Sequence, residues 1–278
     1  MSTKSFSSKY NHSQLMPYAI GILSILLVIQ MLSYDKAPVL AVTDNSLSGS
    51  AGNSAITTNP NCGQVVTGNV KLTSNLICNS DGLIVGGPDT KINLNGFSIR
   101  GPGIDSNKAG ISISGQENIT IMGNGEITGF SSGIYISGSN NVLTKNVNIS
   151  INKIAIYISG SKFSDINNNM LNNNTIAISS QSSTLTNITN NLMSGNSNAG
   201  ITFKNTVGSS INENNILNTK IGIFMDVQSS LNKVNFNNLF NNELDIDNAN
   251  NLAVNINNNY FTDNNCNTSL PSGLCVGR

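Results

Sequence analysis

Three charged residues in the C-terminal half of the chain have a spacing that could support catalysis. Lys204, Asp226 and Asp247 follow one another at nearly equal intervals along the chain. If neighbouring strands carry the two aspartates diagonally, ~7–8 Å apart, the pair could hydrolyse a glycosidic bond with inversion. In a lyase, Lys204 would act as the base and the aspartates would hold Ca²⁺. The alternative is a surface ion pair between Lys204 and Asp226, which would contribute little energy.

Three aromatic residues have a spacing that suits sugar binding. Tyr135 and Tyr157 occupy the same position in two successive repeats of the sequence, and Phe224 occupies it three repeats further on. Flat rings on a polar surface can pack against sugar rings while nearby Ser and Asn side chains form hydrogen bonds. The alternative for the tyrosines is a cross-strand aromatic pair that only stabilises a sheet.

The four cysteines form two close pairs near the two ends of the folded region. We predict disulfides Cys62–Cys78 and Cys266–Cys275, because the number is even and the chain carries an export signal. The alternative is a zinc site, which would need all four cysteines to bind one ion, because no histidine lies nearby to serve as a ligand. The sequence therefore predicts no metal centre and no cofactor, except Ca²⁺ in the lyase alternative.

A short repeat, with a period of roughly 22–23 residues, must position these side chains. Its units start with a small residue followed by Ile, and only the last start is not small. The starts are Gly110, Gly133, Ala155, Ala177, Gly200, Gly222 and Asp245. Most units carry a second apolar residue two positions after the Ile, which indicates a strand with one buried face.

Asparagines form a second column in step with the first. They are Asn124, Asn146, Asn169, Asn191, Asn214, Asn237 and Asn259. We expect these residues to adopt left-handed turns and to stack as a hydrogen-bonded ladder. Helical repeats and leucine-rich repeats do not fit this composition. The predicted fold is all-β: a single-stranded right-handed parallel β-helix with three short strands per coil and about nine coils over residues 61–278.

The chain has 278 residues and a formal net charge of zero, which gives no electrostatic basis for binding nucleic acid or anionic lipid. Residues 1–33 combine early lysines with an apolar run, which is typical of a signal peptide or an uncleaved membrane anchor. Residues 34–60 are small and polar, and we interpret them as a flexible linker. Either N-terminal segment predicts an exported protein, whether extracellular, cell-surface or periplasmic, that meets a membrane only through this segment.

The repeats resemble a known group of proteins. The stretches "CGQVVTGNVKLTSNLIC" and "GLIVGGPDTKINLNGFSIRGPG", followed by the "GIxI…N" coils, are similar to right-handed parallel β-helices of the pectin-lyase-like superfamily, and closest to the NosD type. This resemblance covers about residues 61–261. It implies an exported location, and copper handling or carbohydrate chemistry. Carbohydrate enzymes of this fold act on the outer face of the first strand of each coil, which is where the resemblance places the residues discussed above.

The copper role is not supported by the residues themselves. His12 is the single histidine and precedes the export segment, and the cysteines are predicted to be oxidised. Met193 and Met225 fall at inward positions, so core packing explains them. Our first hypothesis is a non-catalytic β-helix that binds glycan or serves as a surface structural element. The alternatives are a polysaccharide lyase or glycoside hydrolase, and a NosD-type copper-handling protein.

Overall fold

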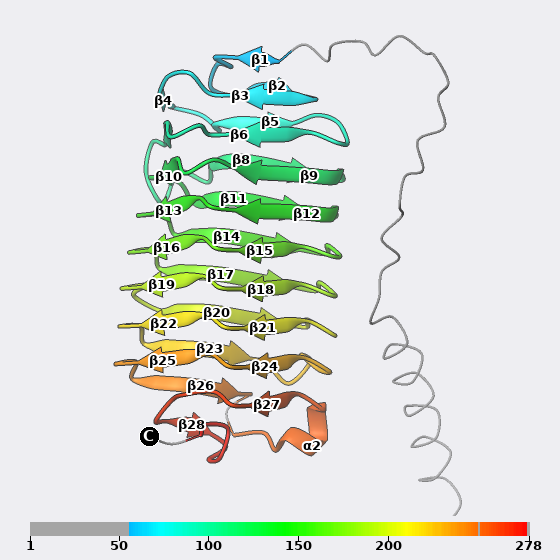
Figure 1. The fold of residues 1–278 in the computed structure, drawn as a ribbon, viewed down its shortest axis with the longest axis vertical. Coiled ribbons are helices and arrows are strands. Elements are labelled where there is room, and N and C mark those ends of the chain that lie inside the picture. Colours follow the sequence, from blue (N-terminus) through cyan, green and yellow to red (C-terminus); the bar gives the residue numbers. More distant parts are fainter. Residues whose placement is uncertain (1–55, 250, 277–278) are drawn as a thin grey trace, which may run out of the picture. The chain divides into compact units, whose positions relative to one another are not determined.

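The computed structural model describes residues 56–249 and 251–276, which form a parallel β-helix of about nine turns (Figure 1). Each complete coil adds one strand to each of three sheets, and every strand pairs in parallel with the equivalent strand of the next coil. The predicted fold class is confirmed. The three sheets are numbered here in the order in which a coil enters them.

Sheet 1 contains β2 (Gln64–Val66), β5 (Leu83–Val85), β8 (Ala109–Ser114), β11 (Ser132–Ser137), β14 (Ile154–Ser159), β17 (Ile176–Gln181), β20 (Ala199–Lys204), β23 (Ile221–Met225), β26 (Leu244–Asn248) and β28 (Ser269–Leu270). Sheet 2 contains β1 (Thr57–Thr58), β3 (Asn69–Lys71), β6 (Lys91–Asn93), β9 (Glu117–Met122), β12 (Asn140–Lys145), β15 (Asp165–Asn167), β18 (Asn187–Thr189), β21 (Ser210–Asn212), β24 (Lys233–Asn235) and β27 (Tyr260–Thr262). Sheet 3 contains β4 (Leu76–Ile77), β7 (Ser98–Arg100), β10 (Glu126–Thr128), β13 (Asn148–Ser150), β16 (Met170–Asn172), β19 (Leu192–Ser194), β22 (Asn215–Leu217) and β25 (Asn238–Phe240). The short helix α2 (Val254–Asn257) lies in the last coil.

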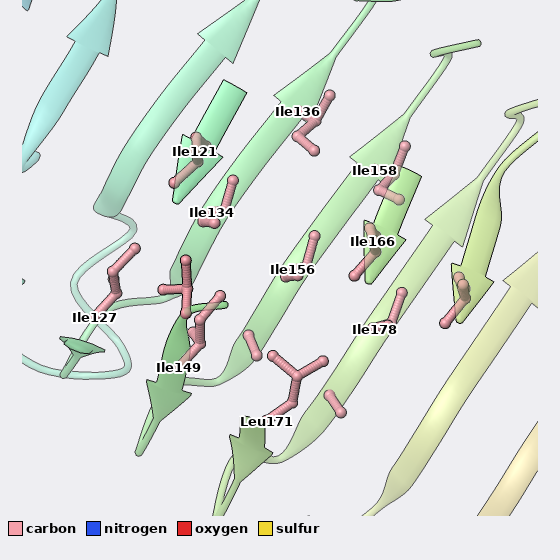
Figure 2. Packing of buried hydrophobic residues seen from close by; sticks show 14 of the residues in the cluster. Ile121, Ile127, Ile134, Ile136, Ile149, Ile156, Ile158, Ile166, Leu171 and Ile178 are labelled. Carbon is pink, nitrogen blue, oxygen red and sulfur yellow. The ribbon is translucent and has the colours of Figure 1, made fainter. Parts of the chain in front are cut away.

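The core consists of aliphatic columns that run from coil to coil. Ile134 pairs in register with Ile156, and Ile136 pairs with Ile158; all four side chains are fully buried. Figure 2 shows them beside residues from the other two sheets, among them Ile166 and Leu171. Because the side chains of a strand alternate between its two faces, this inward set leaves the intervening residues to cover the outside.

The small residue before each Ile is required by close packing at a corner. A Cβ atom on Gly133 would overlap the Ile149 side chain and the carbonyl oxygen of Ala155. The column tolerates Ala in two coils, but nothing larger until Asp245. Asp245 lies where the chain caps the solenoid, and its carboxylate accepts hydrogen bonds from the main-chain amides of Asn267 and Thr268. The exception in the repeat is thus a C-terminal cap.

An asparagine ladder is present, but its composition differs from the prediction. Buried amides are linked in the order Asn169, Asn191, Asn214, Asn237 and Asn264. Each Asn oxygen after the first also accepts a bond from the main-chain amide of its predecessor in the ladder. The ladder therefore satisfies main-chain groups at a buried corner that no strand pairing reaches.

Three predicted members lie elsewhere. Asn124 and Asn146 are one residue out of register: they adopt the left-handed conformation, and the ladder position after Asn146 is occupied by Val147. In the later coils the residue before the ladder Asn takes this conformation, for example Asn168 and Asn190. The expectation that the ladder residues themselves are left-handed is therefore wrong for Asn169, Asn191, Asn214 and Asn237.

Asn259 belongs to a second ladder. Its side-chain oxygen accepts bonds from the amide groups of Asn232, and it precedes β27 of sheet 2 rather than a strand of sheet 3. Because the last coil contains α2, the asparagines that pair across it are 27 residues apart. The shorter regular period therefore predicts Asn259 as the partner of Asn237, whereas the actual partner is Asn264. A third ladder includes Asn152, Asn174 and Asn196.

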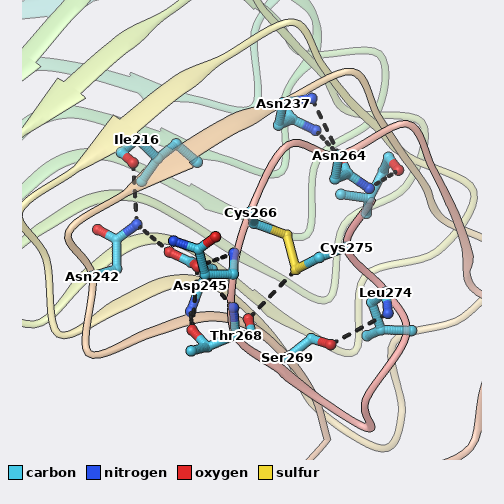
Figure 3. Close-up of a disulfide and its surroundings, with 12 residues drawn as sticks. Ile216, Asn237, Asn242, Asp245, Asn264, Cys266, Thr268, Ser269, Leu274 and Cys275 are labelled. Carbon is cyan, nitrogen blue, oxygen red and sulfur yellow. Dashed lines mark hydrogen bonds between the residues drawn. A yellow bond between two sulfur atoms is a disulfide. The ribbon is translucent and has the colours of Figure 1, made fainter. Parts of the chain in front are cut away.

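Both predicted disulfides are present at the two ends of the solenoid. Cys62 is bonded to Cys78, and Cys266 is bonded to Cys275. Figure 3 shows the second bond beside the Asp245 cap, where Thr268 and Ser269 complete the last turn. Solenoid ends expose unpaired strand edges, and these bonds fix the chain where no further coil covers it.

The folded part begins before the predicted boundary at residue 61, because β1 already pairs with β3 in sheet 2. The predicted signal peptide or anchor, residues 1–33, and most of the predicted linker lie outside the described residues. Within residues 56–249 and 251–276, no helix has the length and apolar character needed to cross a membrane.

Candidate functional site

The outer face of sheet 1 carries Tyr135, Tyr157, Phe224, Asp247 and Lys204, whereas Asp226 follows the end of β23. Register pairing places Ser112, Tyr135, Tyr157 and Ser179 in one column, and continues it through Thr202, Phe224 and Asp247. A parallel column holds Ser114, Ser137, Ser159, Gln181 and Lys204. In the four coils that contain β8, β11, β14 and β17, both columns are uncharged.

Tyr135 and Tyr157 form a stacked pair at the centre of the uncharged region. Their ring centroids are 5.6 Å apart and the ring planes differ by 25°. The Tyr157 hydroxyl donates a hydrogen bond to Gln181 Oε1 at 2.8 Å, which fixes the orientation of its ring. Both residues are half-buried, so part of each ring remains accessible. The pair therefore combines a rigid apolar surface with polar groups at its edge.

Asp226 is held by a turn. Its Oδ1 atom accepts bonds from the main-chain amide of Asn205 at 3.0 Å, and from the amide and hydroxyl of Ser229 at 2.9 and 2.7 Å. These donors stabilise the chain as it leaves β23. They also direct one carboxylate oxygen toward the protein, away from any ligand on the sheet.

The other two charged candidates are dispersed along the sheet. Lys204 is exposed at the end of β20, and its pairing partner is Gln181 of the preceding coil. The ion pairs seen in the described residues, Lys108–Asp81 and Lys153–Asp105, do not include Lys204 or Asp226. The described residues therefore do not show the predicted surface pair between these two, because Asn205 and Ser229 engage the Asp226 carboxylate instead.

Asp247 is buried, in register with Phe224 on the adjacent strand. Phe224 lies three coils below Tyr157 on the same column, so it is separated from the tyrosine pair by Ser179 and Thr202. The structure thus brings together Tyr135 and Tyr157 among the predicted ligand-binding residues, and leaves Phe224 beside Asp247.

Two groups of residues could not be found from spacing. The bond between Gln181 and Tyr157 depends on side-chain conformations that spacing does not reveal. Asp89, Asn118 and Asn141 form a linked polar row on sheet 2. Asn118 and Asn141 are 23 residues apart, as the repeat requires, but Asp89 and Asn118 are 29 residues apart. Because of this longer interval, the period of the repeat does not predict the row.

The three stacked sheets and the polar outer face of sheet 1 define a parallel β-helix. A family model described as "Periplasmic copper-binding protein (NosD)" matches residues 62–273. The chain therefore belongs to the NosD family. A search of curated proteins gave no match.

Several solved structures are similar at low sequence identity. An alginate lyase from Paenibacillus sp. str. FPU-7 has a TM-score of 0.45 and 14% identity, over 63% of this chain and 70% of the lyase. DFA-IIIase from Arthrobacter chlorophenolicus A6, in complex with GF2, has a TM-score of 0.46 and 14% identity, over 70% of this chain and 52% of that enzyme. PfbA, a surface adhesin of Streptococcus pneumoniae, has a TM-score of 0.42 and 15% identity, over 67% of this chain and 61% of the adhesin.

The described residues do not fit the copper ion that the family description implies. Copper prefers imidazole and sulfur ligands. The single histidine, His12, lies outside the described residues, and the four cysteines are oxidised. Met193 and Met225 are fully buried in the core, as predicted. Within residues 56–249 and 251–276, no three His, Cys, Asp or Glu side chains cluster as metal ligands.

Proposed function

We propose that this protein is an exported, non-catalytic β-helix that binds a neutral glycan on the outer face of sheet 1. The observation that carries the proposal is the Tyr135–Tyr157 pair, stacked at 5.6 Å and joined to Gln181. Aromatic rings bind the apolar faces of sugars, and the surrounding hydroxyl and amide groups suit sugar hydroxyls. Two disulfides and membership of a family described as periplasmic support export.

The ligand is neutral because the face around the tyrosines carries no charge that would select an ion. Ser112 and Ser114 flank the pair on the neighbouring strand β8, and Ser137 and Ser159 lie on the same strands as the two tyrosines. Lys204 and Asp226 lie further along the sheet, and the Asp226 carboxylate already accepts three hydrogen bonds. These contacts favour binding over the lyase or hydrolase alternative.

The test is binding of the full-length chain to laminarin, yeast mannan, dextran and xyloglucan, with alginate and pectin as acidic comparators. The double variant Tyr135→Ser and Tyr157→Ser replaces the rings by the residue type found at Ser112 and Ser179 of the same column, so the fold should persist. We expect its affinity for a bound neutral polysaccharide to fall at least tenfold. Tyr260→Ser is the matched control, since Tyr260 is exposed on sheet 2.

Two results would contradict the proposal. One is a failed binding test: equal binding by the double variant and the parent chain would show that the tyrosines are not the site, and the absence of binding to every neutral polysaccharide would favour a structural role. The other is turnover of any of these polymers, with or without Ca²⁺, that Asp226→Asn abolishes, which would establish an enzyme. This substitution keeps a side-chain oxygen for the turn, so lost turnover would not reflect a lost fold.

A further inference from the structure

The outer face of sheet 2 contains a groove that the proposed function does not use. It has a volume of about 540 Å³ and lies over the N-terminal coils. Asp89, Lys91, Asn118, Asn141 and Leu143 are among the residues that line it. A volume of this size is typical of sites that bind small ligands, and the lining combines polar groups with an apolar side chain.

The polar groups of the groove form an ordered row across three coils. Asn141 Nδ2 donates to Asn118 Oδ1 at 2.8 Å, and Asn118 Nδ2 donates to Asp89 Oδ1 at 3.0 Å. All three residues are exposed and adopt the left-handed conformation, with φ of 54°, 59° and 55°. These bonds fix the direction of each amide and engage only one of the two Asp89 carboxylate oxygens. The row therefore presents preorganised acceptors, and Lys91 adds a donor.

Phe163 continues the same column one coil beyond Asn141. The main-chain amide of Asn141 donates to the carbonyl oxygen of Lys162 in the next coil. This bond places Phe163, which follows Lys162, next to Asn141 at the end of the row. Phe163 also has a left-handed backbone, with φ of 54°, and its side chain is 52% exposed. Asn tolerates this conformation far better than a bulky aromatic residue. The next residue of this column, Leu185, is also left-handed and 41% exposed. The exposed ring of Phe163 therefore lies between the polar row and a further apolar side chain, where a ligand can contact it.

We propose that this groove, extended by Phe163, is a second carbohydrate-binding site that holds a neutral sugar chain along the solenoid axis. The polar row would bind hydroxyl groups through Asp89 and Lys91, and the ring of Phe163 would pack against the apolar face of the next sugar. The negative charge of the Asp89 carboxylate and the positive charge of the Lys91 ammonium group cancel, which again favours a neutral polymer. The inference takes its ligand class from the proposed function, but its residues lie on a different sheet.

The test uses the full-length chain and the same polysaccharide panel, with dissociation constants from calorimetry. Phe163→Asn installs the residue found at Asn118 and Asn141, so the fold should be kept, and we expect binding about fivefold weaker. Asp89→Asn retains the oxygen that accepts from Asn118 but removes the charge, and should weaken binding about tenfold, as for the loss of a charge-assisted hydrogen bond. Phe236→Asn is the matched control.

Phe236 makes this control informative because its environment is similar. It is 53% exposed, has a φ of 55°, and lies outside the groove. The inference is overturned if Phe163→Asn and Asp89→Asn bind as tightly as Phe236→Asn while the double tyrosine variant loses binding. In the reverse result the groove site stands and the tyrosine site fails. If the parent chain binds no neutral polysaccharide, both are wrong.

Discussion

Replacing Asn191 by alanine tests whether the buried asparagine ladder stabilises the coils. The Asn191 amide donates to the Ile166 carbonyl at 2.8 Å and to Asn214 Oδ1 at 3.0 Å, and its oxygen accepts from the main-chain amide of Asn169 at 3.0 Å. Asn214 Oδ1 retains its bond from the Asn191 main-chain amide, at 3.0 Å. The substitution therefore removes this partner from two buried main-chain groups, Asn169 N and Ile166 O, and from the part-buried carbonyl of Thr189.

Each buried polar group that loses its partner costs about 1–3 kcal/mol, so the free energy of unfolding should fall by about 4 kcal/mol. The measurement is urea unfolding of the full-length chain, followed by circular dichroism of the strands. The slope against urea concentration is compared as well, because a lower slope would indicate that only part of the solenoid unfolds.

Asn190→Ala is the control for the neighbouring residue. Asn190 is exposed and has a left-handed backbone, with a φ of 55°. Alanine should therefore destabilise this position only because it adopts the left-handed conformation less readily than Asn. That loss should cost about 1 kcal/mol. If Asn191→Ala costs no more than Asn190→Ala, the ladder provides no net stabilisation, and its regularity reflects only the repeat.

Three further predictions concern packing, crosslinks and copper. Gly133→Ala should lower the free energy of unfolding by about 1–3 kcal/mol, because the added methyl group meets Ile149 and the Ala155 carbonyl; an unchanged urea midpoint would show that the corner can expand. Reduction of Cys62–Cys78 and Cys266–Cys275 opens loops of 16 and 9 residues, for which the chain-entropy model gives losses of about 3 and 2.5 kcal/mol in the free energy of unfolding. Urea unfolding with and without reductant measures this loss, and coincident curves would contradict it. Titration with Cu(I) and Cu(II) should show no stoichiometric binding below micromolar concentration, and such binding would reveal ligands outside the described solenoid.

The solenoid could be predicted because its signal is repeated in every coil. Ile134 and Ile156 are one period apart and pair in register, and the same relation holds for Tyr135 and Tyr157. In a parallel β-helix a sequence interval of one period becomes a contact between neighbouring strands. The core columns, the tyrosine pair and the outer face of sheet 1 all follow from this single rule.

Corners were harder to predict, because runs of Asn offer more than one register. The stretch Asn167–Asn169 contains one strand residue, one left-handed residue and one buried ladder residue. Both corner positions favour Asn, for different reasons: one needs a residue that tolerates positive φ, and the other needs an amide that can donate and accept. Spacing alone could not separate them, which explains why Asn146 was assigned to the ladder.

The chemistry of the outer face depends on contacts that a repeat cannot encode. Asp226 and Asp247 lie on successive coils, as predicted, yet a carboxylate can serve a reaction only if its oxygens face the substrate. One Asp226 carboxylate oxygen accepts three hydrogen bonds at the turn after β23, and Asp247 is buried. Tyr135 and Tyr157 are instead fixed by each other and by Gln181, with part of each ring still accessible. The rigid aromatic surface and the anchored carboxylates together support the proposal that this face binds a sugar chain.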